Sequence, residues 1–323
     1  MALTLACAFA TSEQSHEHAR IAEELGYERA WFYDSPALYP DVWVQLCRAA
    51  ERTKKIGLGP GVLVPHLRHP MTNAAAIATL VSIAGQKRVV VGIGSGFTGR
   101  LTMGQRPLKW SYVSEYVRVL RALLRGEEVT WENGAMRMLH PAGFGAPRPI
   151  DVPFVIAAAG PKGVAAAREV GGGVLGAWTP VPGFKWSVVL TMGTVLAEGE
   201  SPGSARSIAA AGHAASVGFH FALENRQLER IPRGEQWAAA YRDVPERTRH
   251  LALHDQHLIA VNERDRPFVT GEVLAGQELA LTSADWRKRA RAIEAQGGTE
   301  IAYQPAGPDI PRELAAFASA VRG

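Results

Sequence analysis

The chain has 323 residues, of which 47% are hydrophobic and 20% are charged. A chain of this length buries about three quarters of the surface that its unfolded form exposes, so the composition excludes a largely disordered protein. No apolar stretch approaches the ~20 residues that a membrane-spanning helix needs. Two cysteines are too few for a disulfide scaffold. The net charge of +4 comes from scattered basic residues, which does not indicate a nucleic-acid-binding protein.

The first ten residues are apolar and end in Ala-Phe-Ala, which resembles a signal-peptide cleavage site. No positively charged residue precedes this stretch, and a signal peptide needs such a charged region. We therefore interpret the segment as a first strand. We expect a cytoplasmic protein that acts on a small molecule, without a membrane or a nucleic acid as a partner.

The first half of the chain alternates short apolar segments with helical patterns. Continuous apolar runs are typical of strands that are buried on both faces, and Gly or Pro marks the helix ends between them. Four strand–helix units in succession predict a parallel sheet. We expect strands at 3–9, 30–33, 56–64 and 88–93, and helices at 15–25, 43–50, 70–84 and 113–124.

The second half continues this rhythm less regularly. Eight strands in all fit a (β/α)₈ TIM barrel, which we predict as a single domain over residues 1–323. An open doubly wound sheet is the alternative, although it normally has fewer units. Two lid-like insertions, at about 97–110 and 225–280, follow strands four and seven and would lie at the carboxyl face, where barrels hold their active sites. The expected elements are strands at 154–158, 173–178, 208–217 and 300–304, and helices at 162–170, 187–197 and 312–321.

A G-x-G-x-x-G pattern directly follows the fourth predicted strand, from Gly94 through Ser95 and Gly96 to Gly99. Dinucleotide-binding folds use such a pattern to bring a pyrophosphate to a helix N-terminus. No helix is expected to begin at Gly99, which argues against that fold. A glycine-lined strand end that a flat ligand can approach is the better interpretation.

A second glycine motif, Gly160-Pro161-Lys162-Gly163, lies between a strand and a helix. Proline suits the first turn of a helix, where its missing N–H is not needed. The free N–H groups there stabilise an anion, and phosphate sites recur in this late part of barrels. An ordinary Gly-Pro turn is the alternative.

Two further features stand at the ends of strands two and three. Asp34 would either contact a ligand or cap the helix near Pro40. The run from Gly59 to Val62 interrupts the third strand with Gly and Pro, which indicates a bulge or a backbone that packs against something flat.

Several histidines are grouped in the chain. His250, His254 and His257 fall near one helical face, but no cluster of acidic or cysteine ligands accompanies them. We therefore predict histidines that face solvent or substrate, and no metal site. His66 and His69 precede Pro70, whose place at a helix start indicates that they partly serve as caps.

The motifs taken together carry a family resemblance over essentially the whole chain. In this order and spacing they resemble the bacterial luciferase-like superfamily, and in particular its coenzyme F420-dependent branch. No single stretch carries the resemblance, which rests on the ordered set. The stretches are 23–27 with 31–34, 61–70, 91–96, 121–126, 159–162 and 304–309.

The resemblance implies a barrel with a flat deazaflavin lying across the carboxyl ends of its strands, and a homodimer. It also implies a non-prolyl cis peptide at Gly61–Val62 beneath the middle of the ring system. The cofactor's ribityl chain and phosphate would then reach the glycine motifs. The implied cofactor-binding residues are Asp34, Gly61, Val62, Val64, Gly94, Ser95, Gly96, Ala159, Gly160, Pro161, Lys162 and Trp178.

The chain departs from the sugar-phosphate dehydrogenases of that branch at two positions. Ser35 stands where they place His, and Phe97 stands where they place Glu. Without this acid/base pair, the expected activity is hydride transfer between the deazaflavin C5 and a small organic C=C, C=N or C=O substrate. Histidine is the natural proton donor near neutral pH, and the candidates are His66, His213, His254 and His257.

Two alternatives remain open on the sequence. One is an FMN-dependent monooxygenase of the same superfamily, which would activate dioxygen. The other is a barrel that binds a ligand without catalysis.

Overall fold

The computed structural model describes residues 3–323, and a closed ring of eight parallel strands forms its centre. The hydrogen-bonded order is β3-β2-β1-β12-β9-β8-β7-β4. Bridges from Leu58 to Val89 and from Leu63 to Ile93 join β3 to β4 and close the ring. The predicted TIM barrel is therefore confirmed. Its strands are β1 (Thr4–Phe9), β2 (Arg29–Phe32), β3 (Gly57–Pro60), β4 (Val91–Gly94), β7 (Phe154–Ala157), β8 (Gly173–Ala177), β9 (Ser187–Met192) and β12 (Glu300–Gln304).

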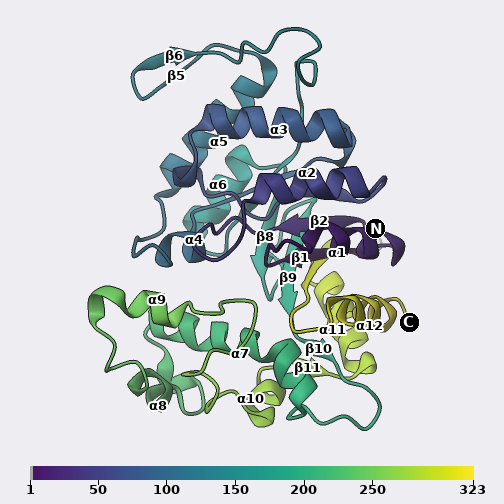
Figure 1. The fold of residues 1–323 in the computed structure, drawn as a ribbon, viewed down its shortest axis with the longest axis vertical. Helices are drawn as coiled ribbons and strands as arrows, with labels where there is room; N and C mark the ends of the chain where they lie inside the picture. The colour runs from purple at the N-terminus through teal and green to yellow at the C-terminus, as the bar shows by residue number, and fades with distance from the viewer. Residues whose placement is uncertain (1–2) are drawn as a thin grey trace.

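Helices pack around this ring, and Figure 1 shows α1, α2, α3, α5 and α6 in the part of the molecule away from the insertion. The last turn of α5 ends at Gly126, whose φ of 83° is the left-handed conformation that favours glycine. No helix of the described residues is long and apolar enough to cross a membrane. The outer helices are α1 (Ser15–Glu24), α2 (Val42–Arg52), α3 (Pro70–Ala84), α5 (Trp110–Arg125), α6 (Pro161–Val170), α11 (Ser283–Ala295) and α12 (Ile310–Arg322).

A helical insertion lies between β9 and α11, and its helices gather beside the barrel in Figure 1. It has its own core, in which Phe219, Trp237 and Tyr241 are buried. A parallel pair of two-residue strands joins its two ends. Its elements are β10 (Thr194–Val195), α7 (Ala205–Glu224), α8 (Gly234–Ala239), α9 (Arg249–Leu253), α10 (Gly271–Gly276) and β11 (Ala280–Leu281).

Two predicted elements around this insertion are wrong. Residues 187–197 begin with strand β9 instead of a helix, because a short apolar run that is buried on both faces has no periodicity to separate the two. Residues 208–217 belong to helix α7 instead of a strand. Ser204 caps that helix, and its alanine-rich sequence has high helix propensity. The insertion therefore begins well before residue 225.

Smaller differences concern the other predicted insertion and the strand ends. Residues 97–110 are not all loop, because the short helix α4 (Phe97–Leu101) begins directly after Gly96. Strand β3 ends at Pro60, and the chain then enters the 3₁₀ helix η1 (Pro65–Leu67). An unpredicted hairpin of β5 (Val129–Trp131) and β6 (Gly134–Met136) projects at the end of the molecule far from the insertion (Figure 1).

Aromatic and charged side chains fill the amino-terminal end of the barrel. Glu300 at the start of β12 is buried and accepts hydrogen bonds from the indoles of Trp31 and Trp186, at 2.9 Å and 3.0 Å. Arg29 pairs with the same carboxylate. This end is therefore sealed, which leaves the carboxyl end as the face at which a ligand can enter the barrel.

The approach of β3 to β4 depends on Gly59. A Cβ placed on this residue would lie 1.9 Å from the carbonyl oxygen of Val90, far inside van der Waals contact. Only a residue without a side chain allows the two strands to come this close. The glycine that interrupts the sequence pattern is thus a requirement of barrel closure.

Replacing Gly59 by Ala tests this constraint. We expect Gly59→Ala to lower the free energy of unfolding by at least about 1–3 kcal/mol, the usual cost of overpacking, as measured by urea denaturation. Gly276→Ala is the matched control, because a Cβ there meets no heavy atom of the described chain within 4 Å. Equal stability of the two variants would contradict the argument.

Candidate active site at the barrel mouth

The segment after β3 forms one side of the barrel mouth. The peptide bond between Gly61 and Val62 is cis, as the resemblance implied. Both residues are half-buried, whereas Leu63 is buried and returns to pair with β4. The main chain of Gly61 and Val62 is therefore partly open at the carboxyl end of the strands.

Two glycines, at the end of β4 and two residues after it, pack against this same segment. A Cβ on Gly94 would lie 2.8 Å from Val62 Cγ2, and one on Gly96 would lie 2.5 Å from Val64 Cγ1. Gly96 also has a φ of 82° and directly precedes α4. Contacts within the protein thus account for both glycines. Between them, Ser95 is half-buried and its carbonyl accepts a hydrogen bond from the backbone N–H of Leu108 at 2.8 Å.

Asp34 lies at the end of β2 in a buried ion pair. Its carboxylate accepts a hydrogen bond from Arg68 at 2.6 Å, and the same guanidinium reaches Asp41 at 2.7 Å. The alternative that Asp34 caps the following helix is wrong, because Asp41 caps α2. Burial raises the pKa of Asp34, and the Arg68 guanidinium opposes this effect. These ion pairs tie the end of η1 to the segment between β2 and α2.

The N-terminus of α6 is exposed at the same end of the barrel. Ala159, Gly160, Pro161 and Lys162 are all exposed, and no side chain of the described residues caps the first turn. A Cβ on Gly160 would meet no heavy atom of the described chain within 4 Å. This turn therefore has the open N–H groups and the space that an anion requires.

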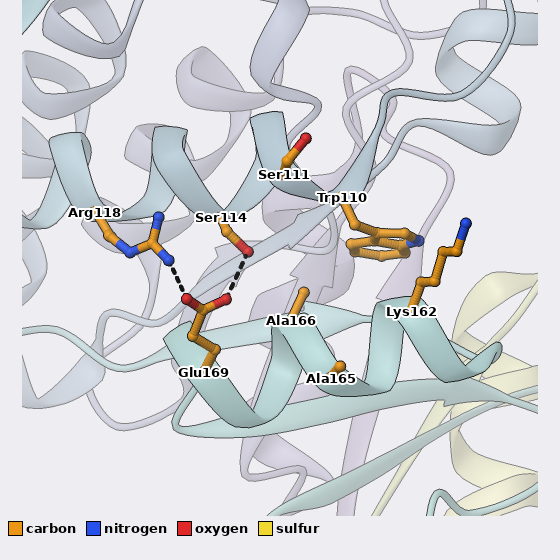
Figure 2. A pocket seen from close by; sticks show the side chains of 8 residues that line it. All are labelled: Trp110, Ser111, Ser114, Arg118, Lys162, Ala165, Ala166 and Glu169. Carbon is orange, nitrogen blue, oxygen red and sulfur yellow. Dashed lines mark hydrogen bonds and ion pairs between the residues drawn. The ribbon is translucent and has the colours of Figure 1, made fainter.

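A cavity of about 500 Å³ lies beside this turn, between α5 and α6. Figure 2 shows Lys162 next to the ring of Trp110, and Glu169 held by Arg118 and Ser114 further along the two helices. Two cations line this cavity. Arg118 pairs with Glu169, whereas Lys162 forms no ion pair with a described acidic residue.

Trp178 follows β8 and connects the barrel to the insertion. It has a φ of 69°, which is unusual for a large side chain, and it packs against the core of the insertion. The guanidinium of Arg289 lies 5.7 Å from its ring centroid. Trp178 is therefore held in place at the mouth from two sides.

The four predicted proton donors lie in two different environments. His66 is exposed in η1, directly after the cis peptide segment. His213, His254 and His257 are buried in the insertion. Of the two histidines expected to cap the helix at Pro70, His69 does so: its Nδ1 accepts a hydrogen bond from the backbone N–H of Met71 in α3.

Burial changes the acid–base character of the buried histidines. It lowers the pKa of His213 to about 4 and that of His254 to about 4. It also lowers the pKa of His257, to which neighbouring histidines contribute. The lowered pKa values favour the neutral form of these three imidazoles at pH 7, and the single N–H of a neutral imidazole is too weak an acid to serve as a general acid.

The structure also groups residues that sequence reasoning missed. His220 joins His254 and His257, and one ring nitrogen from each of the three lies within 4.8 Å of the others. His250, which the sequence grouped with His254 and His257, is not a member. In the strand expected at 208–217, positions 213 and 220 would fall on opposite faces, whereas seven residues along a helix return to the same face. Recognising α7 from its Ser204 cap and alanine content would have placed His213 and His220 on one helix face, but it would not have brought His220 to His254 and His257.

A second cavity, of about 480 Å³, lies at the carboxyl ends of β1 and β12. Its volume falls within the range of small-molecule sites. Leu258 of the insertion lines it and packs against the core of the barrel. Most of the lining is apolar, with a few polar groups at one side: Phe9, Ala10, Thr11, Ser12, Glu13, Gln14, His18, Leu38, Tyr39, Pro40, Leu258, Ile259, Pro305, Ala306, Gly307, Pro308, Ile310 and Pro311.

The sequence profile of the luciferase-like monooxygenase family matches residues 10–303. The chain belongs to this family. A 5,10-methylenetetrahydromethanopterin reductase from Archaeoglobus fulgidus is 33% identical over 162 residues, 49% of this chain and 47% of the relative. An F420-dependent glucose-6-phosphate dehydrogenase from Beutenbergia cavernae is 31% identical over 176 residues, 48% of this chain and 49% of the relative. The chain thus spans about half the length of these curated relatives, and the resemblance to the F420-dependent branch is confirmed.

A solved structure supports the fold over the full length. The coenzyme F420-dependent tetrahydromethanopterin reductase from Methanopyrus kandleri superposes with a TM-score of 0.68 at 19% identity. The match covers 100% of this chain and 99% of that chain. At this identity the likeness establishes the common barrel architecture.

Removing the cation of the buried ion pair tests its importance. The side chains of Arg68 and Asp34 are 14% and 2% exposed, so Arg68→Met leaves a buried carboxylate with its main cation gone. We expect a loss of about 3–5 kcal/mol in the free energy of unfolding. Arg118→Met breaks a pair whose side chains are 53% and 54% exposed, and should cost at most about 1 kcal/mol. Comparable losses in the two variants would refute the argument.

Proposed function

We propose that the protein is a coenzyme F420-dependent oxidoreductase that transfers a hydride between the deazaflavin C5 and a small organic C=C, C=N or C=O substrate. The open first turn of α6, with Gly160 and Lys162 exposed at the barrel mouth, is the observation that carries this proposal. This turn would supply an anion site at the same end of the barrel as the partly open main chain of Gly61 and Val62. The F420-dependent relatives support the choice of cofactor.

The residues at the mouth fit a flat cofactor with a phosphate-bearing side chain. The N–H groups at the start of α6 and the ammonium of Lys162 would hold the phosphate. The main chain of Gly61 and the side chain of Val62 would support the ring system, while Ser95 would contact the ribityl chain. Asp34 acts through Arg68, by holding the segment that follows the cis peptide in place.

When bound, the reduced deazaflavin supplies the hydride; the protein supplies orientation and a dry site. The insertion covers the mouth, since Tyr39 after β2 donates a hydrogen bond to the backbone carbonyl of His257 at 2.7 Å. The side-chain amide of Gln304 donates to the carbonyl of Leu258 at 2.8 Å. These two bonds hold Leu258 at the mouth, where it excludes water from the reacting atoms.

The apolar cavity beside Leu258 fits the acceptor substrate better than a sugar phosphate. Its volume of about 480 Å³ and its apolar lining suit a small, uncharged organic molecule. Ser35 is buried, and Phe97 places an apolar ring, 44% exposed, on α4. Neither position offers the acid/base group of the sugar-phosphate dehydrogenases.

Parallel titration with F420 and FMN tests the cofactor assignment. We expect quenching of F420 fluorescence with one site per chain, and FMN binding at least tenfold weaker. Preferential FMN binding, with dioxygen consumption on reduction, would instead establish the monooxygenase. Binding of F420 without turnover in a broad acceptor screen would indicate a ligand-binding barrel.

The phosphate site can be tested without disturbing the fold. Gly160→Val fills open space at the first turn of α6, so F420 binding should weaken at least about tenfold, or ~1.4 kcal/mol, with an unchanged melting temperature. Gly172→Val is the control at the other end of the helix, where a Cβ meets only the Phe154 carbonyl, at 3.7 Å. Equal F420 affinity in both variants would remove the site from α6.

We assign proton delivery to His66, because the three buried candidates are neutral. His66→Asn should lower kcat by about 10²–10⁴-fold, the usual contribution of a general acid, while the F420 dissociation constant stays the same. His140→Asn, on the segment between α5 and β7 at the sealed end of the barrel, is the control. A His66 variant with full kcat would exclude this role.

A homodimer and a cytoplasmic location belong to the same proposal. Light scattering on the purified protein tests the dimer directly, since a mass of twice 34.8 kDa is expected.

A further inference from the structure

The buried histidines of the insertion have more ring nitrogens than hydrogen-bond partners. His213 and His220 have no partner for either ring nitrogen among the described residues. The rings of His220, His254 and His257 pack with centroids 4.8–5.4 Å apart. Buried polar groups without partners are costly, so a group of this kind indicates a missing partner.

We infer that His220, His254 and His257 form a buried site for one divalent transition-metal ion, with Zn²⁺ as the representative case. One nitrogen of each ring lies within 4.8 Å of the others. In a tetrahedral zinc site with Zn–N bonds of about 2.0–2.1 Å, ligand nitrogens lie about 3.3 Å apart. The Nδ1 atoms of His254 and His257 are already 3.4 Å apart.

The surroundings of two of these rings match those of metal ligands. A metal-bound histidine normally directs its other nitrogen at a hydrogen-bonding group, which fixes the ring. Nε2 of His257 lies 3.4 Å from Thr98 Oγ1, within hydrogen-bond distance. Nε2 of His220 faces Asp265 Oδ2 at 3.8 Å, which is within ion-pair range but too long for a hydrogen bond. In both residues Nδ1 is left for the metal.

Charge balance points the same way. Asp265 is 1% exposed, and its Oδ1 accepts hydrogen bonds from the Trp237 indole and the Tyr241 hydroxyl, both at 2.6 Å. Among residues 3–323 the ion-pair partner of this carboxylate is the buried ring of His220, whose Nε2 lies 3.8 Å away. A divalent cation would compensate the buried carboxylate through the His220 ring, and neutral imidazoles are the form that binds a metal.

The ion would join α7 to the turn after α9, and through Thr98 it would join the insertion to α4 at the barrel mouth. Three protein ligands leave a fourth position for water or another small ligand. The site is independent of the cofactor, because it uses none of the residues assigned to F420 or to proton delivery.

The test measures metal binding by the purified, chelator-treated full chain without any cofactor. We expect one equivalent of Zn²⁺, measured by mass spectrometry and competition with a chelator. Co²⁺ should give the visible absorption of a tetrahedral site, and X-ray absorption should show three imidazole ligands. Zn²⁺ should raise the melting temperature, because it binds only the folded form. Failure to bind either ion below millimolar concentration would overturn the inference and show a group solvated by buried water.

Variants locate the site. His257→Gln and His220→Gln should each abolish the Co²⁺ absorption, while Asp265→Asn should weaken binding about 10–100-fold. His250→Gln, on the same helical segment but outside the group, should leave binding unchanged. Circular dichroism on each variant checks folding. Stoichiometric binding that survives both ligand variants would show adventitious metal on the surface and would also overturn the inference.

Discussion

The close approach of β3 to β4 is the constraint on which the rest of the molecule depends. The two strands can meet only because residues at their contact lack side chains, with Gly59 against the Val90 carbonyl and Gly94 against Val62. Their meeting closes the ring of eight strands. Closure also places the Gly61–Val62 segment at the carboxyl end, with part of its main chain open. The architecture and the proposed cofactor platform therefore share one physical cause.

The two ends of the barrel differ in whether a ligand can reach them. At the amino end, Glu300 and the indoles that donate to it form a buried, satisfied network, so nothing can enter there. At the carboxyl end, the open turn at Gly160 and the partly exposed Val62 remain available. The insertion lies over this end, and Leu258 brings an apolar side chain to it. Binding is thus restricted to one face, where water can be excluded.

The charges at the mouth suit the anionic cofactor that we propose, while the insertion contains a buried negative charge. Lys162 and the α6 N-terminus present positive potential, and the Arg68 cation is already used by Asp34. In the insertion, the buried carboxylate of Asp265 lies beside the buried ring of His220. One region therefore favours a phosphate and the other favours a metal cation. The proposed redox site and the proposed metal site therefore differ in the sign of the ligand charge that each would favour.

The sequence by itself determined the barrel and the motifs at the strand ends, because turns, glycines and buried apolar runs are encoded locally. The family resemblance, carried by the order of the motifs, also implied the cis peptide that the structure has at Gly61–Val62. It did not determine the order of β9 and α7, because a doubly buried strand and an alanine-rich buried helix look alike when only hydrophobicity is read. Consequently it could not bring His220 to His254 and His257, which lie on separate segments of the insertion. Only the tertiary structure decided that grouping and the burial that keeps these rings neutral, since both arise from packing between residues distant in the chain.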